Sequence, residues 1–230
     1  MPPSVSPKPS AIDPEFPAHL QLNRPSTMKS RSALLITSAQ HDLLHPSGLA
    51  WKLVESTVVK NDVVQKLKRL VAGARAARIP VIHSPIELDY EAACGGPPLS
   101  AFQELAFSVK PLAKGSLGAR IIPELAPVAG DILLPPRMGF SSFWAGTINP
   151  VLRELGVLDL YIAGLLSHAC VESHARDAVE NGYRPTVIRD ATAAAGDELL
   201  QASYTSLGLQ AHRLIYTDEA LKSWSGTPVS

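Results

Sequence analysis

The chain has 230 residues, of which 46% are hydrophobic and 18% charged, and its 21 basic residues balance 21 acidic ones. Such an apolar chain can bury a core large enough to offset chain entropy, which excludes global disorder and favours one compact domain. The net charge of zero argues against nucleic acid and anionic membranes as partners. We find neither an apolar run of the roughly 18 to 20 residues that span a bilayer nor the apolar stretch of a secretory signal, so we expect a cytoplasmic protein.

The first 31 residues are rich in proline and serine and show no hydrophobic period. This composition is typical of an extended arm, so we expect a flexible arm over residues 1–31 and one folded domain over residues 32–230. The two cysteines, Cys94 and Cys170, are too few for a disulfide framework.

From Ser32 onward, short β-rich apolar runs alternate with segments of helical period. Strands are predicted at 33–37, 79–83, 131–134, 158–163, 185–188 and 213–216. Helices are predicted at 56–77, 148–155, 170–181 and 197–207, with Gly182 and Gly208 at two helix ends. The alternation predicts an α/β fold, a doubly wound and mostly parallel six-stranded sheet with helices on both faces, as in a Rossmann-like three-layer sandwich.

The connection from Ser84 to Gly130 is unusually long and rich in proline and glycine. Long connections in α/β domains are usually functional, and open sheets bind ligands at the carboxyl ends of their strands. We therefore expect this connection to contribute to a binding pocket.

The predicted strand at 158–163 runs through a glycine turn into a helix that begins near Cys170. A thiol at a helix N-terminus feels the positive end of the helix dipole and lies beside backbone N–H groups that can hold an oxyanion. That is a suitable position for a nucleophile. The alternative is that Cys170 is a small buried apolar residue at a strand-to-helix junction.

Three segments, SALLITSAQHDL at 32–43, RMGFSSFWAGT at 137–147 and the stretch at 164–177, occur in one order along the chain, together with KGSLG at 114–118. Over roughly residues 32–221 the sequence resembles the isochorismatase-like cysteine hydrolase superfamily. The resemblance implies the doubly wound sheet already inferred.

The resemblance also implies a catalytic triad of Asp, Lys and Cys. The cysteine falls on Cys170, whereas Ser38 occupies the aspartate position and Arg137 the lysine position. It further implies an oxyanion hole formed by the amides of Leu166 and Cys170, with a cis peptide bond between Leu165 and Leu166.

Ser38 cannot replace the aspartate as a base at neutral pH, whereas Arg137 keeps the positive charge but cannot shuttle protons. His174, four residues after the cysteine, and His168, two residues before it, are candidates for the missing base or for substrate contact. Each has an ordinary alternative, packing against the sheet for His174 and exposure in a turn for His168. His41 and Asp42 are a further candidate pair, although Asp42 matches a position at which the resemblance implies a structural acid.

Metal-binding nicotinamidase relatives use an Asp-x-His pair and another histidine beyond the second strand, where residues 83–89 here read HSPIELD. We therefore expect no metal and no cofactor. Phe143 and Trp144 lie in the segment that lines the family's pocket and, with Arg137, would suit a small carboxylate or amide. Their alternatives are a core position for Phe143 and a subunit interface for Trp144.

We expect a divergent hydrolase that acts on a small amide, imide, ester or related carbonyl compound through Cys170, without nucleic acid or membrane partners, as a homo-oligomer (dimer or tetramer). Two alternatives stay open. One is a catalytically silent relative that binds a small ligand or a protein, favoured by the loss of Asp and Lys. The other is a non-hydrolytic isomerase or lyase that uses the same pocket.

Overall fold

The computed structural model describes residues 31–91 and 100–225. Apart from Arg31, the predicted arm lies outside the described residues, and so does Cys94. In the described part of the chain, no helix is both long and apolar enough to cross a membrane.

The fold is built on one six-stranded sheet, in which every neighbouring pair of strands is parallel. The strand order is β3-β2-β1-β4-β5-β6. The strands are β1 (Arg31–Thr37), β2 (Val81–Ser84), β3 (Ile132–Leu133), β4 (Val157–Leu165), β5 (Arg184–Ala193) and β6 (Arg213–Ile215). The predicted doubly wound α/β fold is confirmed, and the strand order reverses between β1 and β4, where such sheets bind ligands.

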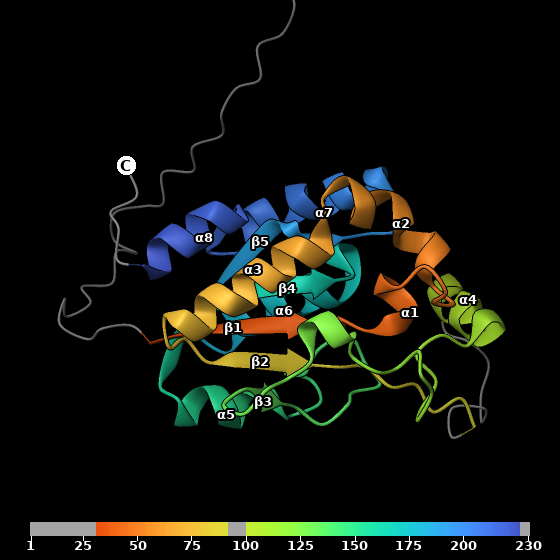
Figure 1. Cartoon of the computed structure of the whole chain (residues 1–230), viewed down its shortest axis with the longest axis horizontal. Coiled ribbons are helices and arrows are strands. Elements are labelled where there is room, and N and C mark those ends of the chain that lie inside the picture. The colour runs from red at the N-terminus through yellow and green to blue at the C-terminus, as the bar shows by residue number, and fades with distance from the viewer. Residues whose placement is uncertain (1–30, 92–99, 226–230) are drawn as a thin grey trace, which may run out of the picture.

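Helices cover both faces of this sheet (Figure 1). The helices α2 (Trp51–Lys60), α3 (Val63–Ala76) and α8 (Thr217–Trp224) pack on one face, and α5 (Ile148–Glu154), α6 (Glu172–Glu180) and α7 (Asp197–Gln210) pack on the other. Side chains of β1 alternate between the two cores, with Leu34 and Ile36 on the α3 side and Ala33 and Leu35 on the α6 side. Two short helices, α1 (His41–Leu44) and α4 (Ala101–Val109), lie beyond the carboxyl ends of the strands (Figure 1).

Two helix predictions are wrong in their boundaries. The helix expected at 56–77 is interrupted between α2 and α3, because Asp62 adopts a left-handed conformation with φ of 49°. Helix α7 continues through Gly208 to Gln210, since a single glycine weakens a helix without ending it. Gly182 does follow the end of α6, with φ of 85°, as predicted.

The close approach of β1 and β4 positions the candidate site. Thr37 lies opposite Gly164 in the parallel pair, and the Thr37 hydroxyl donates a hydrogen bond of 2.8 Å to the Leu165 carbonyl. Gly164 has φ of 111°, and a Cβ atom built there would lie 2.1 Å from the Thr37 carbonyl oxygen. Glycine is therefore required where these two strands end side by side.

Candidate active site

Ser38 and Cys170 meet where β1 and β4 end. Ser38 directly follows β1, is buried, and adopts a left-handed conformation with φ of 50°. Cys170 lies in a single π-helical turn, η3 (Ser167–Val171), that follows β4 and precedes α6. The Ser38 hydroxyl donates to the Cys170 sulfur over 3.8 Å.

The helix expected to begin near Cys170 opens with the π-helical turn from Ser167 to Val171, and its α-helical part, α6, starts at Glu172. A single π-helical turn at the start of a helix is frequent at functional sites. The peptide bond between Leu165 and Leu166 is cis. Cys170 is therefore held in the turn between strand and helix, not in the first turn of the α-helix itself.

Arg137 is buried directly behind Ser38, with a side chain only 2% exposed. Its Nη2 donates to Ser38 Oγ over 3.0 Å, and its Nη1 lies 2.6 Å from the Ser84 carbonyl and 2.9 Å from the Pro85 carbonyl. Among the ion pairs formed by described residues, none includes Arg137. The guanidinium is thus a buried cation surrounded by neutral acceptors.

The hydrogen bonds in this cluster have a fixed direction. A guanidinium can only donate, so the Ser38 oxygen accepts from Arg137, and the Ser38 hydroxyl in turn donates to the sulfur of Cys170. In this arrangement Ser38 presents its proton to the sulfur. This polarity is opposite to that of a carboxylate at the same position.

His174 lies beneath the site and is held as a neutral ring. Its Nε2 accepts the Ser142 backbone N–H over 3.0 Å, so its Nδ1 carries the proton and donates to the Cys170 carbonyl over 2.6 Å. Burial, reinforced by the positive charge of Arg137 and opposed by the Cys170 backbone bond, lowers the pKa of His174 from 6.5 to about 3. Both ring nitrogens are occupied, so His174 connects the cysteine turn to the Ser142 segment and has no lone pair for the thiol proton.

The other candidate bases also lie outside the Ser38–Arg137–Cys170 cluster. Asp42 is buried and accepts the backbone N–H groups of Leu49 and Leu112 at 2.9 and 2.7 Å, so its carboxylate connects two loops. His41 stacks on His45 with ring centroids 4.4 Å apart. His168 is half-buried, and burial lowers its pKa, opposed by the charge of Glu172.

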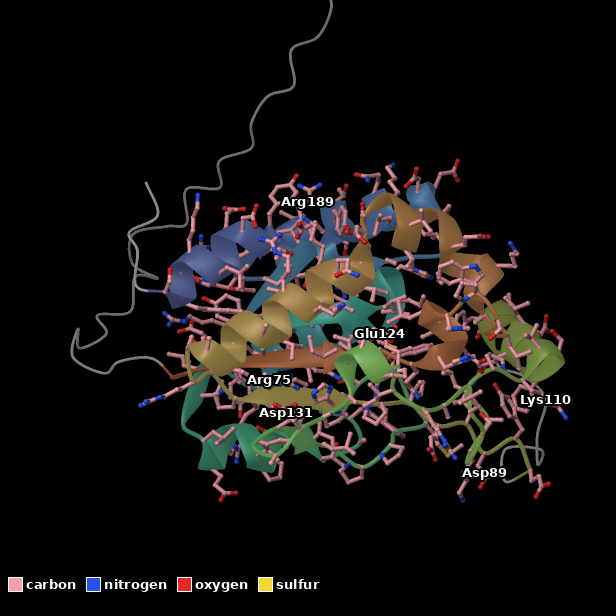
Figure 2. All side chains as sticks on the ribbon, viewed as in Figure 1. Arg75, Asp89, Lys110, Glu124, Asp131 and Arg189 are labelled. Carbon is pink, nitrogen blue, oxygen red and sulfur yellow. The ribbon has the colours of Figure 1, made fainter. Side chains whose placement is uncertain are left out.

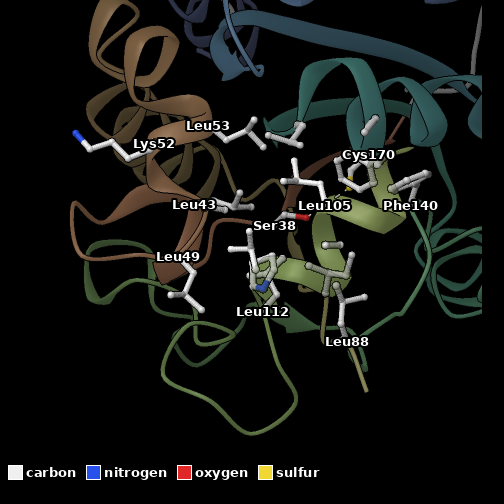
Figure 3. Close-up of a pocket in the computed structure, with 18 residues that line it drawn as sticks. Ser38, Leu43, Leu49, Lys52, Leu53, Leu88, Leu105, Leu112, Phe140 and Cys170 are labelled. Atoms are coloured by element: carbon white, nitrogen blue, oxygen red, sulfur yellow. Dashed lines mark hydrogen bonds between the residues drawn. The ribbon is translucent and has the colours of Figure 1, made fainter. Parts of the chain in front are cut away.

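A cavity of about 400 Å³ opens above Ser38 and Cys170 (Figure 3). Apart from Ser38, Cys170 and Lys52, every side chain that lines it is apolar. The apolar lining residues are Leu43, Leu49, Ala50, Leu53, Ile86, Leu88, Phe102, Leu105, Ala106, Val109, Pro111, Leu112, Phe140, Leu166 and Ala169. Eight of them, from Ile86 to Leu112, come from the long connection that the sequence predicted to build a pocket.

Five residues expected to contact substrate lie outside this lining: Phe143, Trp144, His41, His168 and His174. Phe143 is buried against Tyr183 and His174, with ring centroids 5.8 and 6.4 Å away, whereas Trp144 is 84% exposed. Phe143 thus takes the core position stated as its alternative, whereas the subunit interface stated for Trp144 stays a prediction. The neighbouring Phe140 lines the cavity instead, and sequence reasoning missed it together with the apolar residues of α4. The apolar run within the otherwise loop-like connection was the available signal for α4.

Charged side chains elsewhere pair with one another away from the cavity. Figure 2 shows Arg75 and Asp131 side by side beneath α3, whereas Asp89 and Lys110 lie at the end of the molecule that carries α4. Asp131 accepts from both Arg75 and His83, and burial lowers the pKa of His83 against the opposing effect of Asp131. Within residues 31–91 and 100–225, no three His, Cys, Asp or Glu side chains are grouped so as to hold a metal ion.

Most of the chain matches a known protein family and a known relative. The family model described as "Isochorismatase domain" matches residues 32–219. The ureidoacrylate amidohydrolase RutB of Pseudomonas syringae pv. syringae (strain B728a) is 32% identical over 202 residues, which cover 81% of this chain and 80% of that protein.

Solved structures with low sequence identity share the fold. A cysteine hydrolase from Pseudomonas syringae pv. phaseolicola 1448A matches with a TM-score of 0.73 at 22% identity, covering 85% of this chain and 93% of that one. The N-carbamoylsarcosine amidase from Thermoplasma acidophilum matches with a TM-score of 0.63 at 24% identity, covering 82% and 97%.

Proposed function

The chain belongs to the isochorismatase family of hydrolases, and from this premise we propose that it hydrolyses a small carbonyl compound through Cys170 as the nucleophile. The observation that carries the proposal is the placement of Cys170 in the cavity wall, with Ser38 and the buried Arg137 directly behind it. The relatives named ureidoacrylate amidohydrolase and N-carbamoylsarcosine amidase support the cleavage of a C–N bond as one reaction of this family.

In the proposed reaction, Cys170 attacks as the thiolate, its proton having passed to solvent, and the sulfur forms a bond to the carbonyl carbon. The backbone amides of Leu166 and Cys170 donate to the oxyanion of the tetrahedral intermediate. The bond to the leaving group then breaks and a thioester remains on the enzyme. Water attacks this thioester and the C–S bond breaks, so that the carboxylate is released, the water protons pass to solvent and the thiolate of Cys170 is restored.

Arg137 supports this chemistry through its charge. A buried cation without a carboxylate partner is costly, because it has lost its hydration without gaining a counter-charge. A negative sulfur at Cys170, one hydroxyl away, would supply that counter-charge, and the Ser38 proton already points to it. We infer that the cluster stabilises the sulfur as a nucleophile and as a leaving group from the thioester.

The same cluster lacks a group that protonates a departing amine. The cavity lining contains no carboxylate among the described residues, and burial keeps His174 neutral, with both ring nitrogens engaged by backbone partners. A phenolate or thiolate departs without a proton, whereas an amine requires one. We therefore expect esters and thioesters to be hydrolysed faster than the corresponding amides.

A non-catalytic binding protein is the second candidate function. The observation that favours it is the replacement of two proton-transferring residues by Ser38 and Arg137. A non-hydrolytic reaction in the same pocket is the third candidate function.

We also propose that the protein forms a homo-oligomer. The exposed apolar side chains of Met138, Phe140 and Trp144 support this proposal, and a molecular-mass measurement in solution would test it.

The test compares the wild type with Cys170→Ala and Cys170→Ser on a panel of p-nitrophenyl esters, thioesters and anilides. We expect ester hydrolysis by the wild type and a loss of at least about 10³-fold in Cys170→Ala, with an unchanged circular dichroism spectrum. Turnover that survives in Cys170→Ala would contradict the covalent mechanism. A panel that stays flat at high enzyme concentration would favour the binding protein.

A further inference from the structure

We infer that the substrate enters the cavity with an uncharged, apolar acyl group, so that its preferred substrates are esters or thioesters of hydrophobic carboxylic acids. This inference rests on the proposed function and names its substrate class. Three observations support it: the apolar lining of the cavity, the positions of Lys52 and Arg137, and the exposed apolar face of α4.

The lining offers almost no polar partner to a bound group. Beyond Ser38 and Cys170, which face the reacting carbonyl, Lys52 is the one polar side chain that lines the described cavity. Pockets of this size bind ligands mainly through apolar contact and use a few polar groups for orientation. Here Ser38 and Cys170 face the scissile bond, and apart from Lys52 the space around it offers only apolar contact.

Lys52 is poorly placed to bind a substrate carboxylate. Its ammonium is paired with Glu55 at 2.7 Å, and its side chain is 84% exposed. In Figure 3, Lys52 extends away from the other lining side chains. A carboxylate inside the cavity would therefore lose its hydration without gaining an ionic partner from Lys52.

Arg137 does not supply that partner either, because it lies behind Ser38 and outside the lining. Its Nη1 faces the carbonyls of Ser84 and Pro85, and its Nη2 donates to Ser38. A substrate carboxylate would have to displace Ser38 to reach this guanidinium. The described site thus contains a cation for the sulfur and none for a charged substrate tail.

Helix α4 gives the cavity an apolar wall that a ligand would cover. Phe102, Leu105 and Val109 are spaced three and four residues apart, so they share one face of the helix, and all three line the cavity. They are 38%, 46% and 38% exposed, and α4 contains no fully buried residue. Phe102 also packs edge-to-face against Phe140, with ring centroids 5.5 Å apart. An apolar acyl chain that packs on α4 would remove these side chains from water. The burial of this apolar surface would make the free energy of binding more favourable.

The test compares two esters that differ in one terminal group, p-nitrophenyl hexanoate and the mono-p-nitrophenyl ester of adipic acid. In each, the Cys170 sulfur forms a bond to the acyl carbon while the bond to p-nitrophenolate breaks, and water later releases the acid. We expect kcat/KM, corrected for hydrolysis in buffer, to be at least about 10²-fold higher for the hexanoate. We also expect kcat/KM to rise from acetate through butyrate to hexanoate. An adipate ester hydrolysed as fast as the hexanoate would overturn the inference.

A charge placed in the wall makes the test specific. Leu105→Lys adds a cation to the cavity and is expected to lower the preference for hexanoate over adipate at least about tenfold. The matched control is Leu199→Lys, because Leu199 is a helical leucine of similar exposure, 43%, that lies on α7 outside the lining. An equal change of preference in the two variants would overturn the role of α4.

A binding arm separates this inference from the proposed function. In Cys170→Ala, which is not expected to turn over either compound, calorimetry compares hexanamide with adipamic acid, its counterpart with a terminal carboxylate. Hexanamide that binds at least tenfold more tightly supports the apolar site even when no ester is hydrolysed by the wild type. Equal binding of the two compounds, or binding of neither, would overturn the inference even when Cys170 proves to be the nucleophile.

Discussion

Ser38 is the residue that most separates this site from the triad implied by its family. Arg137 donates a hydrogen bond to Ser38, and Ser38 donates one to the Cys170 sulfur. The serine therefore places a positively polarised hydrogen beside the sulfur. A carboxylate in the same place would accept the thiol proton and return it to a leaving amine. In the proposed mechanism, the substitution thus keeps the support for a negative sulfur and removes the proton transfer.

Ser38→Asp is expected to restore amide hydrolysis in part. The new carboxylate would pair with Arg137 and lie within reach of the sulfur, so the rate on a p-nitroanilide should rise at least about tenfold relative to the rate on the matching ester. Ser38→Asn is the control, since an asparagine side chain has nearly the same shape as aspartate but cannot accept and return a proton. The explanation fails if the two variants show the same ratio of anilide to ester turnover.

For individual residues, the family motif predicted which three side chains lie together, since Ser38 contacts both Arg137 and Cys170. It did not predict which aromatic residues face the cavity. Phe140, Phe143 and Trp144 lie within five positions of one another, yet one lines the cavity, one is in the core and one is at the surface. Their directions depend on the path of an irregular segment, which has no hydrophobic period to show which side is buried.

Among the elements, the pairing of β1 with β4 determines the geometry of the site. Both strands end at the same level, with Thr37 opposite Gly164, and the candidate site residues Ser38 and Cys170 follow within a few positions. The apolar runs predicted all six strands: β1, β2, β4 and β5 are mostly buried and nearly continuous in hydrophobicity, and the partly exposed edge strands β3 and β6 keep short apolar runs. The break at Asp62 and the π-helical turn at Cys170 were not predictable, since each is a local change of backbone conformation that leaves the apolar pattern intact.

Gly164→Ala is expected to disturb both the fold and the site. A Cβ atom at Gly164 would clash with the Thr37 backbone, so β1 and β4 must separate and Ser38 must move away from Cys170. Gly182→Ala is the matched control, because Gly182 also has a positive φ but has open space around its Cβ position. Urea unfolding should show an extra loss of about 1–3 kcal/mol for Gly164→Ala relative to Gly182→Ala, with a loss of esterase activity in the first variant only. Equal stabilities would show that the strands tolerate separation.

For the whole molecule, the buried neutral His174 makes folding depend on pH. Its pKa is about 3 in the folded protein against an ordinary value of 6.5, so between these values the unfolded chain binds more protons. The stability that it contributes is therefore complete above about pH 6.5 and is lost as the pH falls toward 3. The free energy of unfolding should fall by up to about 1.4 kcal/mol for each pH unit in this window because of this one group.

His174→Gln should reduce that slope, because glutamine can bond Ser142 and the Cys170 carbonyl without titrating. Urea unfolding at about pH 7 and about pH 5 measures the difference, and the wild type minus the variant isolates His174 from His83 and His168, whose pKa values burial also lowers. His45→Gln, at an exposed histidine, serves as the control and should keep the wild-type slope. An unchanged slope in His174→Gln would show that the buried ring does not control the acid response.

The central claim is that Cys170 carries the acyl group during turnover. Its most direct test is the mass of the wild-type protein after acid quenching during hydrolysis of p-nitrophenyl hexanoate, followed by peptide mapping. With Ser38 in place of a base, attack of water on the thioester should be slow enough for the adduct to accumulate. We predict the mass of one hexanoyl group on the peptide that contains Cys170. Steady hydrolysis with no adduct on that peptide, or with the adduct on another residue, would contradict the account.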